Sequence, residues 1–82
     1  MTDAERKWVK KLQKVLNECP SERIGFYTTG DRSVTVYDRS KEEDINADLD
    51  SGRAGEFGCS VDLNDAYFEV LNFPAPVHST AG

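Results

Sequence analysis

Five carboxylates lie within nine residues of one another near the middle of the chain, and closely spaced carboxylates can bind a hard cation such as Ca²⁺. They are Glu42, Glu43, Asp44, Asp48 and Asp50. A calcium loop of the EF-hand type needs carboxylates at positions 1, 3 and 5, glycine at position 6 and glutamate at position 12. One register places Ser51 at position 6 and Phe57 at position 12. The register with a glycine at position 6 places Ala47 and Leu49 at ligand positions, so the spacing argues against this site.

Two interpretations of these carboxylates remain, a solvated helix face and a surface that binds a basic partner. Runs of charge usually form solvated faces. Carboxylates spaced along a helix can also occupy a basic groove that normally holds phosphates. The chain carries a net charge of −5, which repels nucleic acid at long range. We therefore expect an unidentified protein partner rather than nucleic acid.

Nucleophilic and metal chemistry have few candidate residues. One histidine and two cysteines forty residues apart do not make a structural zinc site. Cysteine catalysis would need His78 beside Cys59, but His78 lies in a proline-spaced tail and Cys59 on an expected core face. Both Cys19 and Cys59 are expected to be reduced and buried. We predict no enzymatic activity and no cofactor.

The N-terminal segment has the pattern of an amphipathic helix over residues 3–18. Thr2 and Glu5 have the spacing of a capping box, and Pro20 ends the helix. Apolar residues recur at the helical period, at Trp8, Val9, Leu12, Val15, Leu16 and Cys19. The opposite face carries Lys7, Lys10, Lys11 and Lys14. These lysines usually form a solvated face, and a nucleic-acid contact is the alternative function.

Residues 24–38 have the pattern of a β-hairpin around Gly30 and Asp31. A three-residue loop at positions 30–32 would place Phe26 opposite Val36, apolar against apolar. Tyr27 and Tyr37 then lie on the other face of the sheet. If the helices cover only the Phe26 face, these tyrosines are exposed and are candidate protein-binding residues.

Residues 40–52 have the pattern of a second helix, with a capping box formed by Ser40 and Glu43. Its buried stripe is Ile45 and Leu49, and Gly52 ends it. Residues 57–63 alternate between apolar and polar types, which predicts a strand. A turn at Asn64 and Asp65 would pair it with a fourth strand ending near residue 72. A helix over residues 63–72 is the competing interpretation.

These elements predict an α+β two-layer sandwich in the order α-β-β-α-β-β. Two helices lie on one face of a small, mostly antiparallel sheet. Residues 1–73 form a single domain, and residues 74–82 are an extended or disordered tail. No apolar run is long enough to span a membrane, and no signal peptide is evident, so we expect a cytoplasmic monomer or homodimer.

Three segments carry a resemblance to a known group of proteins. They are MTDAERKWVKKLQKVLNECP at the start, RIGFYTTGD with the following VYDRSKE, and FPAPVHSTAG at the end. They resemble small uncharacterised accessory proteins encoded by enterobacterial phages and prophages. The resemblance implies a protein that is dispensable for building the virion and acts on host machinery, such as nucleic-acid metabolism or defence. It implies no catalytic residue.

Overall fold

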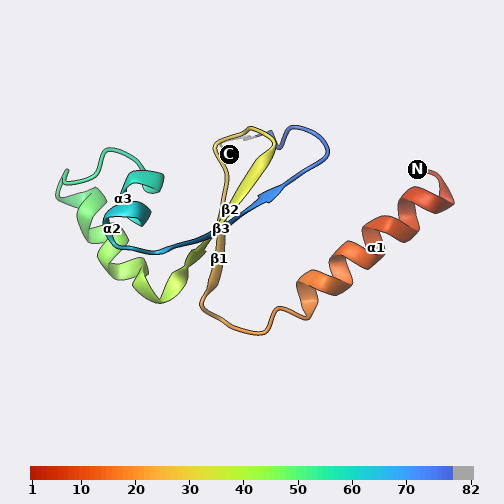
Figure 1. Ribbon diagram of the computed structural model, residues 1–82, viewed down its shortest axis with the longest axis horizontal. Helices are drawn as coiled ribbons and strands as arrows, with labels where there is room; N and C mark the ends of the chain where they lie inside the picture. Colours follow the sequence, from red (N-terminus) through yellow and green to blue (C-terminus); the bar gives the residue numbers. More distant parts are fainter. Residues whose placement is uncertain (79–82) are drawn as a thin grey trace.

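The computed structural model describes residues 1–78 and shows an α+β fold with a three-stranded antiparallel sheet in the order β1-β2-β3 (Figure 1). The elements are α1 (Asp3–Asn17), β1 (Ile24–Tyr27), β2 (Ser33–Asp38), the 3₁₀ helix η1 (Arg39–Lys41), α2 (Glu42–Asp50), α3 (Phe57–Leu63) and β3 (Tyr67–Asn72). The predicted class and the antiparallel sheet are confirmed. The predicted count of four strands is wrong, because residues 57–63 form a helix and the order is α-β-β-α-α-β.

Helix α1 begins where the sequence predicted. The Thr2 side chain accepts a hydrogen bond from the Glu5 N–H at 3.1 Å, and the Glu5 carboxylate accepts from the Thr2 N–H at 2.6 Å. The helix projects away from the sheet, however, and none of its residues is buried (Figure 1). The prediction that it covers the sheet is therefore wrong.

The hairpin of β1 and β2 has the predicted register, with Phe26 opposite Val36. Tyr27 lies opposite Thr35, on the other face. The loop closes through the Thr28 hydroxyl, which donates to the Ser33 carbonyl at 2.9 Å. Pairing apolar with apolar therefore predicted this register correctly.

Strand β3 pairs with β2, with Val34 opposite Leu71 and Thr35 opposite Val70. The register shifts between Val36 and Tyr37, as at a β-bulge. A strand at residues 67–72 was part of the predicted second hairpin, and this part is confirmed.

The core lies on the tyrosine face of the sheet, under α2 and α3. Tyr37, Ile45, Val61 and Ala66 are buried there, and Tyr27, Leu49 and Phe57 pack against them. The helices thus cover the face opposite to the predicted one. In the described residues, the core cluster includes no side chain of the Phe26 face and none of α1. The expectation that both tyrosines are exposed is wrong, since Tyr37 is 5% exposed and Tyr27 is half-buried.

The segment 57–63 is a helix rather than the predicted strand. Phe57, Ser60 and Val61 have the spacing of one helical face, and this face packs on the core. The Ser60 hydroxyl donates to the Ile45 carbonyl at 2.7 Å, which joins α3 to α2. The alternating residue Leu63 points outward and is 52% exposed. The competing prediction of a helix over 63–72 is also wrong.

Helix α2 is preceded by η1, whose N-cap is Asp38, and the N-cap of α2 itself is Lys41, which makes no side-chain capping bond. The Asp38 carboxylate accepts a hydrogen bond from the Ser40 N–H at 3.0 Å. The predicted capping box of Ser40 and Glu43 is therefore wrong. Gly52 follows the helix with a φ of +78°, in the left-handed region that the predicted glycine cap requires.

Beyond β3 the chain runs along the hairpin loop. The Phe73 N–H donates to the Arg32 carbonyl and the Val77 N–H donates to the Asp31 carbonyl, both at 2.7 Å. The predicted tail begins in this stretch, and its residues 79–82 lie outside the described part. No helix in residues 1–78 is both long and apolar enough to cross a membrane.

Candidate interaction surfaces

Two of the five predicted carboxylates are used inside the fold. Glu42 accepts a hydrogen bond from the Tyr37 hydroxyl at 2.9 Å, which ties the first turn of α2 to the sheet. Asp48 accepts from the Asn64 side-chain amide at 2.9 Å and lies 3.6 Å from the Arg53 guanidinium. Both side chains are half-buried. They position α2 within the fold.

The other three carboxylates, Glu43, Asp44 and Asp50, are exposed on α2 and are called the acidic face below. The ion pairs found within residues 1–78 are Arg23–Asp38 and Arg53–Asp48, so none involves the acidic face. Uncompensated exposed carboxylates on a fixed helix create a local negative potential. The structure therefore divides the predicted acidic set into positioning residues and available residues.

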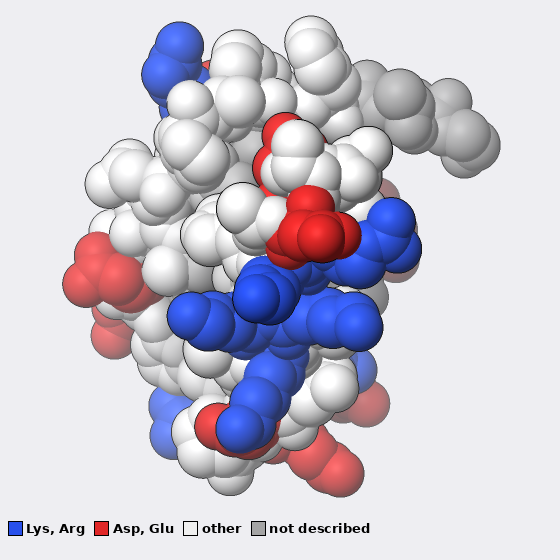
Figure 2. All heavy atoms as spheres, turned by 90° about the vertical axis from the view of Figure 1, so that its right-hand side faces the viewer, with Lys and Arg blue, Asp and Glu red and all other residues white. Residues whose placement is uncertain are grey.

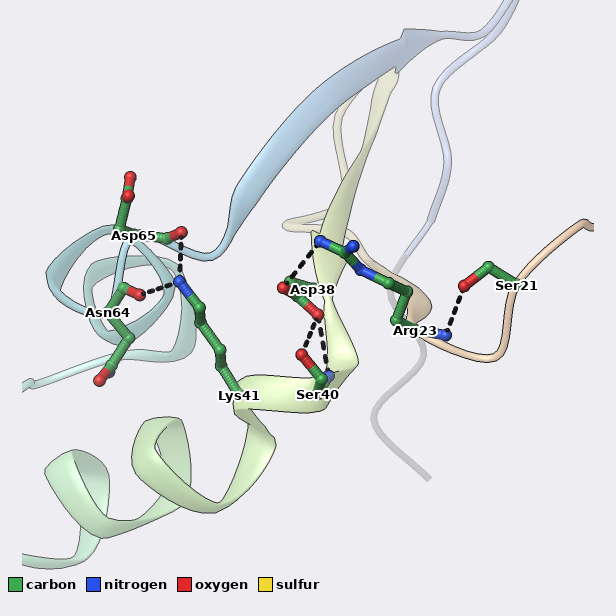
Figure 3. A network of polar contacts seen from close by, with 7 residues as sticks. All are labelled: Ser21, Arg23, Asp38, Ser40, Lys41, Asn64 and Asp65. Carbon is green, nitrogen blue, oxygen red and sulfur yellow. Dashed lines mark hydrogen bonds and ion pairs between the residues drawn. The ribbon is translucent and has the colours of Figure 1, made fainter.

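Lys41 links the start of α2, the helix that carries the acidic face, to the turn after α3. Its ammonium donates to the carbonyl of Asn64 at 3.1 Å and to that of Asp65 at 3.0 Å (Figure 3). Asp65 has a φ of +52°, which an L-residue rarely adopts. The lysine thus holds the turn between α3 and β3 against the start of α2. The two short helices and this turn form one connected unit.

The predicted tyrosine patch is part of an aromatic cluster in the core. The ring centroids of Tyr27 and Tyr37 are 5.9 Å apart, and each lies 5.2 Å from that of Phe57, all edge to face. Burial, reinforced by Glu42, raises the pKa of Tyr37 above its usual value. Tyr37 is too deeply buried to contact a partner.

The predicted lysines of α1 are all exposed, with Arg6 beside them. Figure 2 shows basic side chains gathered on the side of the molecule where α1 lies. The set is Arg6, Lys7, Lys10, Lys11 and Lys14. The structure brings these residues together on one element, separate from α2. They remain the candidate for the alternative nucleic-acid contact.

Two apolar surfaces that were predicted to pack in the core are exposed instead. The first, called the helix stripe, is the exposed apolar face of α1: Trp8, Val9, Leu12, Val15 and Leu16. The second, called the open sheet face, consists of the exposed side chains Phe26 and Leu71 with the half-buried Val34, and Val36 beside them is buried. One feature of the sequence indicated the second surface. Both faces of the hairpin carry apolar or aromatic residues, and the narrow apolar stripe of α2 cannot cover both faces.

Neither cysteine is buried, contrary to the prediction. The Cys59 thiol donates to the Glu56 carboxylate at 3.4 Å, and this bond raises the pKa of Cys59. A raised pKa keeps the sulfur protonated, which is the opposite of an activated nucleophile. Within residues 1–78, no group of three His, Cys, Asp or Glu side chains is arranged to hold a metal ion.

No protein-family model matches the chain, and no curated protein or solved structure shows significant similarity to it.

Proposed function

We propose that the chain is a non-enzymatic interaction protein that binds a basic surface of another protein through the acidic face of α2. The main supporting observation is that the carboxylates of α2 fall into two sets, one bonded within the fold and one exposed. Glu42 and Asp48 fix the helix, while Glu43, Asp44 and Asp50 stand exposed without ion pairs in the described residues. A rigidly held charged helix loses little conformational entropy on binding, which favours affinity.

The distribution of charge supports the same function. Residues 20–82 carry a charge of −7 and residues 1–19 a charge of +2. A negative body attracts basic patches over a distance of about one Debye length, roughly 8 Å at physiological salt. Charge complementarity of this kind raises association rates and selects among partners. The resemblance to phage accessory proteins suggests that the partner is a host protein that normally handles nucleic acid.

The test is retention of proteins from host lysate on the immobilised chain. Wild type is compared with the double variant Asp44→Asn/Asp50→Asn. The matched control, Glu18→Gln/Glu22→Gln, removes the same charge from exposed positions outside α2. We expect a partner that the control retains and the α2 variant loses, with retention falling as salt is raised. A partner retained equally by both variants, or no partner, would contradict the proposal.

The alternative function, nucleic-acid binding by α1, is favoured by the gathering of basic side chains in Figure 2. Lys7, Lys10, Lys11 and Lys14 would contact phosphates. Such contacts release counterions, so the logarithm of the binding constant should fall linearly with the logarithm of salt concentration. An oligonucleotide titration at several salt concentrations tests this. A weak response that does not change with salt would eliminate the alternative.

A further inference from the structure

The chain exposes more surface than a compact monomer of its mass. Its accessible surface is 6361 Å² for 9.2 kDa, whereas folded monomers of that mass expose about 4,900 Å². Its radius of gyration is 15.1 Å, against about 12 Å for a compact domain of this length. The excess, about 1,400 Å² per chain, is surface that a monomeric fold of this size normally buries.

Many of the exposed large apolar side chains lie in the two surfaces defined above. On the helix stripe, Trp8 is 55% exposed and Val15 is 66% exposed. On the open sheet face, Phe26 is 48% exposed and Leu71 is 42% exposed. Contiguous exposed apolar surface of this extent marks an association site in soluble proteins. Both surfaces border one groove of about 190 Å³, which is lined by Trp8 and Leu12 on one side and by Leu71, Asn72, Phe73 and Pro74 on the other.

The linker of residues 18–23, between α1 and β1, is fixed where it meets the sheet. The Arg23 carbonyl accepts a backbone hydrogen bond from the Arg39 N–H at 2.7 Å. The Arg23 guanidinium donates to Asp38 at 3.1 Å (Figure 3). The Arg23 N–H in turn donates to the Ser21 hydroxyl at 3.1 Å, and Pro20 fixes the backbone just before it. These contacts fix the chain where it enters β1, and from there α1 projects away from the sheet (Figure 1).

We propose that the missing element is α1 of a second copy, so that two chains form a symmetric dimer in which each helix stripe covers the partner's open sheet face. The proposal goes beyond the function proposed for α2. A twofold pair uses both surfaces of both chains, which leaves no further site for growth. Two chains together hold about 2,800 Å² of excess surface, more than the roughly 1,600 Å² of a standard stable interface.

Charge complementarity favours a second copy over an unrelated occupant. Residues 1–19 carry +2 and the body carries −7, so the helix of one chain is attracted to the sheet of another. Glu69 lies opposite Val36 on the open sheet face and is exposed. A lysine at the border of an incoming helix stripe could pair with it. Helix α2 lies on the other side of the sheet and stays accessible in such a dimer (Figure 1).

The test is the mass in solution, measured by sedimentation equilibrium over a wide concentration range. We expect wild type to approach twice the chain mass as concentration rises. Trp8→Glu on the helix stripe and Phe26→Glu on the open sheet face should each weaken association by more than about tenfold, since buried aromatic anchors dominate interfaces. Lys10→Gln, with the same charge change on the opposite face of α1, should weaken association far less, since it removes charge but no buried anchor.

Circular dichroism of each variant checks that the sheet is intact, since both mutated side chains are half exposed. Three outcomes would overturn the proposal. Wild type could remain a monomer at every concentration. Trp8→Glu could dissociate the dimer while a folded Phe26→Glu does not, which would indicate pairing of helices alone. Both variants could dimerise like wild type. Asp44→Asn/Asp50→Asn leaves this interface untouched, so failure here is distinguishable from failure of the proposed function.

Discussion

The Tyr37 hydroxyl in β2 donates a 2.9 Å hydrogen bond to the Glu42 carboxylate in the first turn of α2. This bond joins the sheet to the helix that carries the acidic face. Removing the hydroxyl in Tyr37→Phe should lower the free energy of unfolding by about 1 kcal/mol, the usual contribution of such a bond. Urea denaturation measures the loss. An unchanged midpoint would show that the bond contributes nothing.

The same bond predicts a dependence on alkaline pH. Burial and Glu42 raise the folded-state pKa of Tyr37 above its ordinary value of 10.0. The folded state therefore binds the phenolic proton more tightly than the unfolded chain does. The stabilisation is fully present below pH 10 and is lost as pH rises through the folded pKa. Denaturation of wild type and Tyr37→Phe across this range should show a gap that narrows with pH, and a constant gap would contradict the assignment.

The contacts of Asp38 predict that the stability of the fold depends on pH in the acidic range. The Ser40 hydroxyl first, and then the Ser40 N–H and Arg23, hold the pKa of Asp38 below its ordinary value of 3.8. The stabilisation is present above that value and is lost as pH falls through the folded pKa. Ser40→Ala should move the pKa of Asp38 upward in an NMR titration. The Thr29 hydroxyl contacts Asp31 rather than Asp38, so Thr29→Ala should leave the pKa of Asp38 unchanged.

Ile45 is completely buried between α2 and the core, and Ile45→Ala should cost about 2–5 kcal/mol through lost contacts and a residual cavity. A domain this small has a total stability near the lower end of about 5–15 kcal/mol. The variant should therefore be largely unfolded or close to it in thermal melts. Leu63→Ala, at a position that is 52% exposed, is the control and should lose less than about 1 kcal/mol.

Gly25 lies against the ring of Tyr37 in the adjacent strand. An added Cβ would lie 2.7 Å from the ring atom Cε1 and would also meet the Arg39 side chain, closer than real contacts allow. Gly25→Ala should therefore destabilise the sheet by about 1–3 kcal/mol. A Cβ at Gly55 meets nothing within 4 Å, so Gly55→Ala should be close to neutral. Thermal melts of the two variants compare the sites directly.

Local chemistry in the sequence was sufficient for several elements. The capping box of Thr2 and Glu5, the glycine at the end of α2, and the hairpin register at Phe26 and Val36 were all predicted correctly. Each depends on neighbouring residues or on a single pair of strands. The predicted acidic residues are on α2 as expected. Only the coordinates show that Glu42 and Asp48 have internal partners.

Long-range choices were not predictable from these patterns. Residues 57–63 fit both the two-residue period of a strand and the 3.6-residue period of a helix. The tertiary contact of Ser60 with Ile45 favours the helix. The choice of sheet face depended on which helices pack against it. The prediction assumed that α1 packs on the Phe26 face of the sheet. Tyr37, on the other face, was therefore wrongly predicted to be exposed. The pattern showed that α1 is amphipathic, but it could not show whether the partner of its apolar face lies in the same chain.

The lysines of α1 and the carboxylates of α2 lie toward opposite ends of a molecule that is 49 Å long (Figure 1). Opposite charges held so far apart give a single chain a permanent electric dipole moment along its length. In dilute, low-salt solution the chain should turn as it nears a charged particle, presenting α1 to an anionic one and α2 to a cationic one. A symmetric pair cancels the components of two such moments perpendicular to its axis, so dielectric relaxation would register the change.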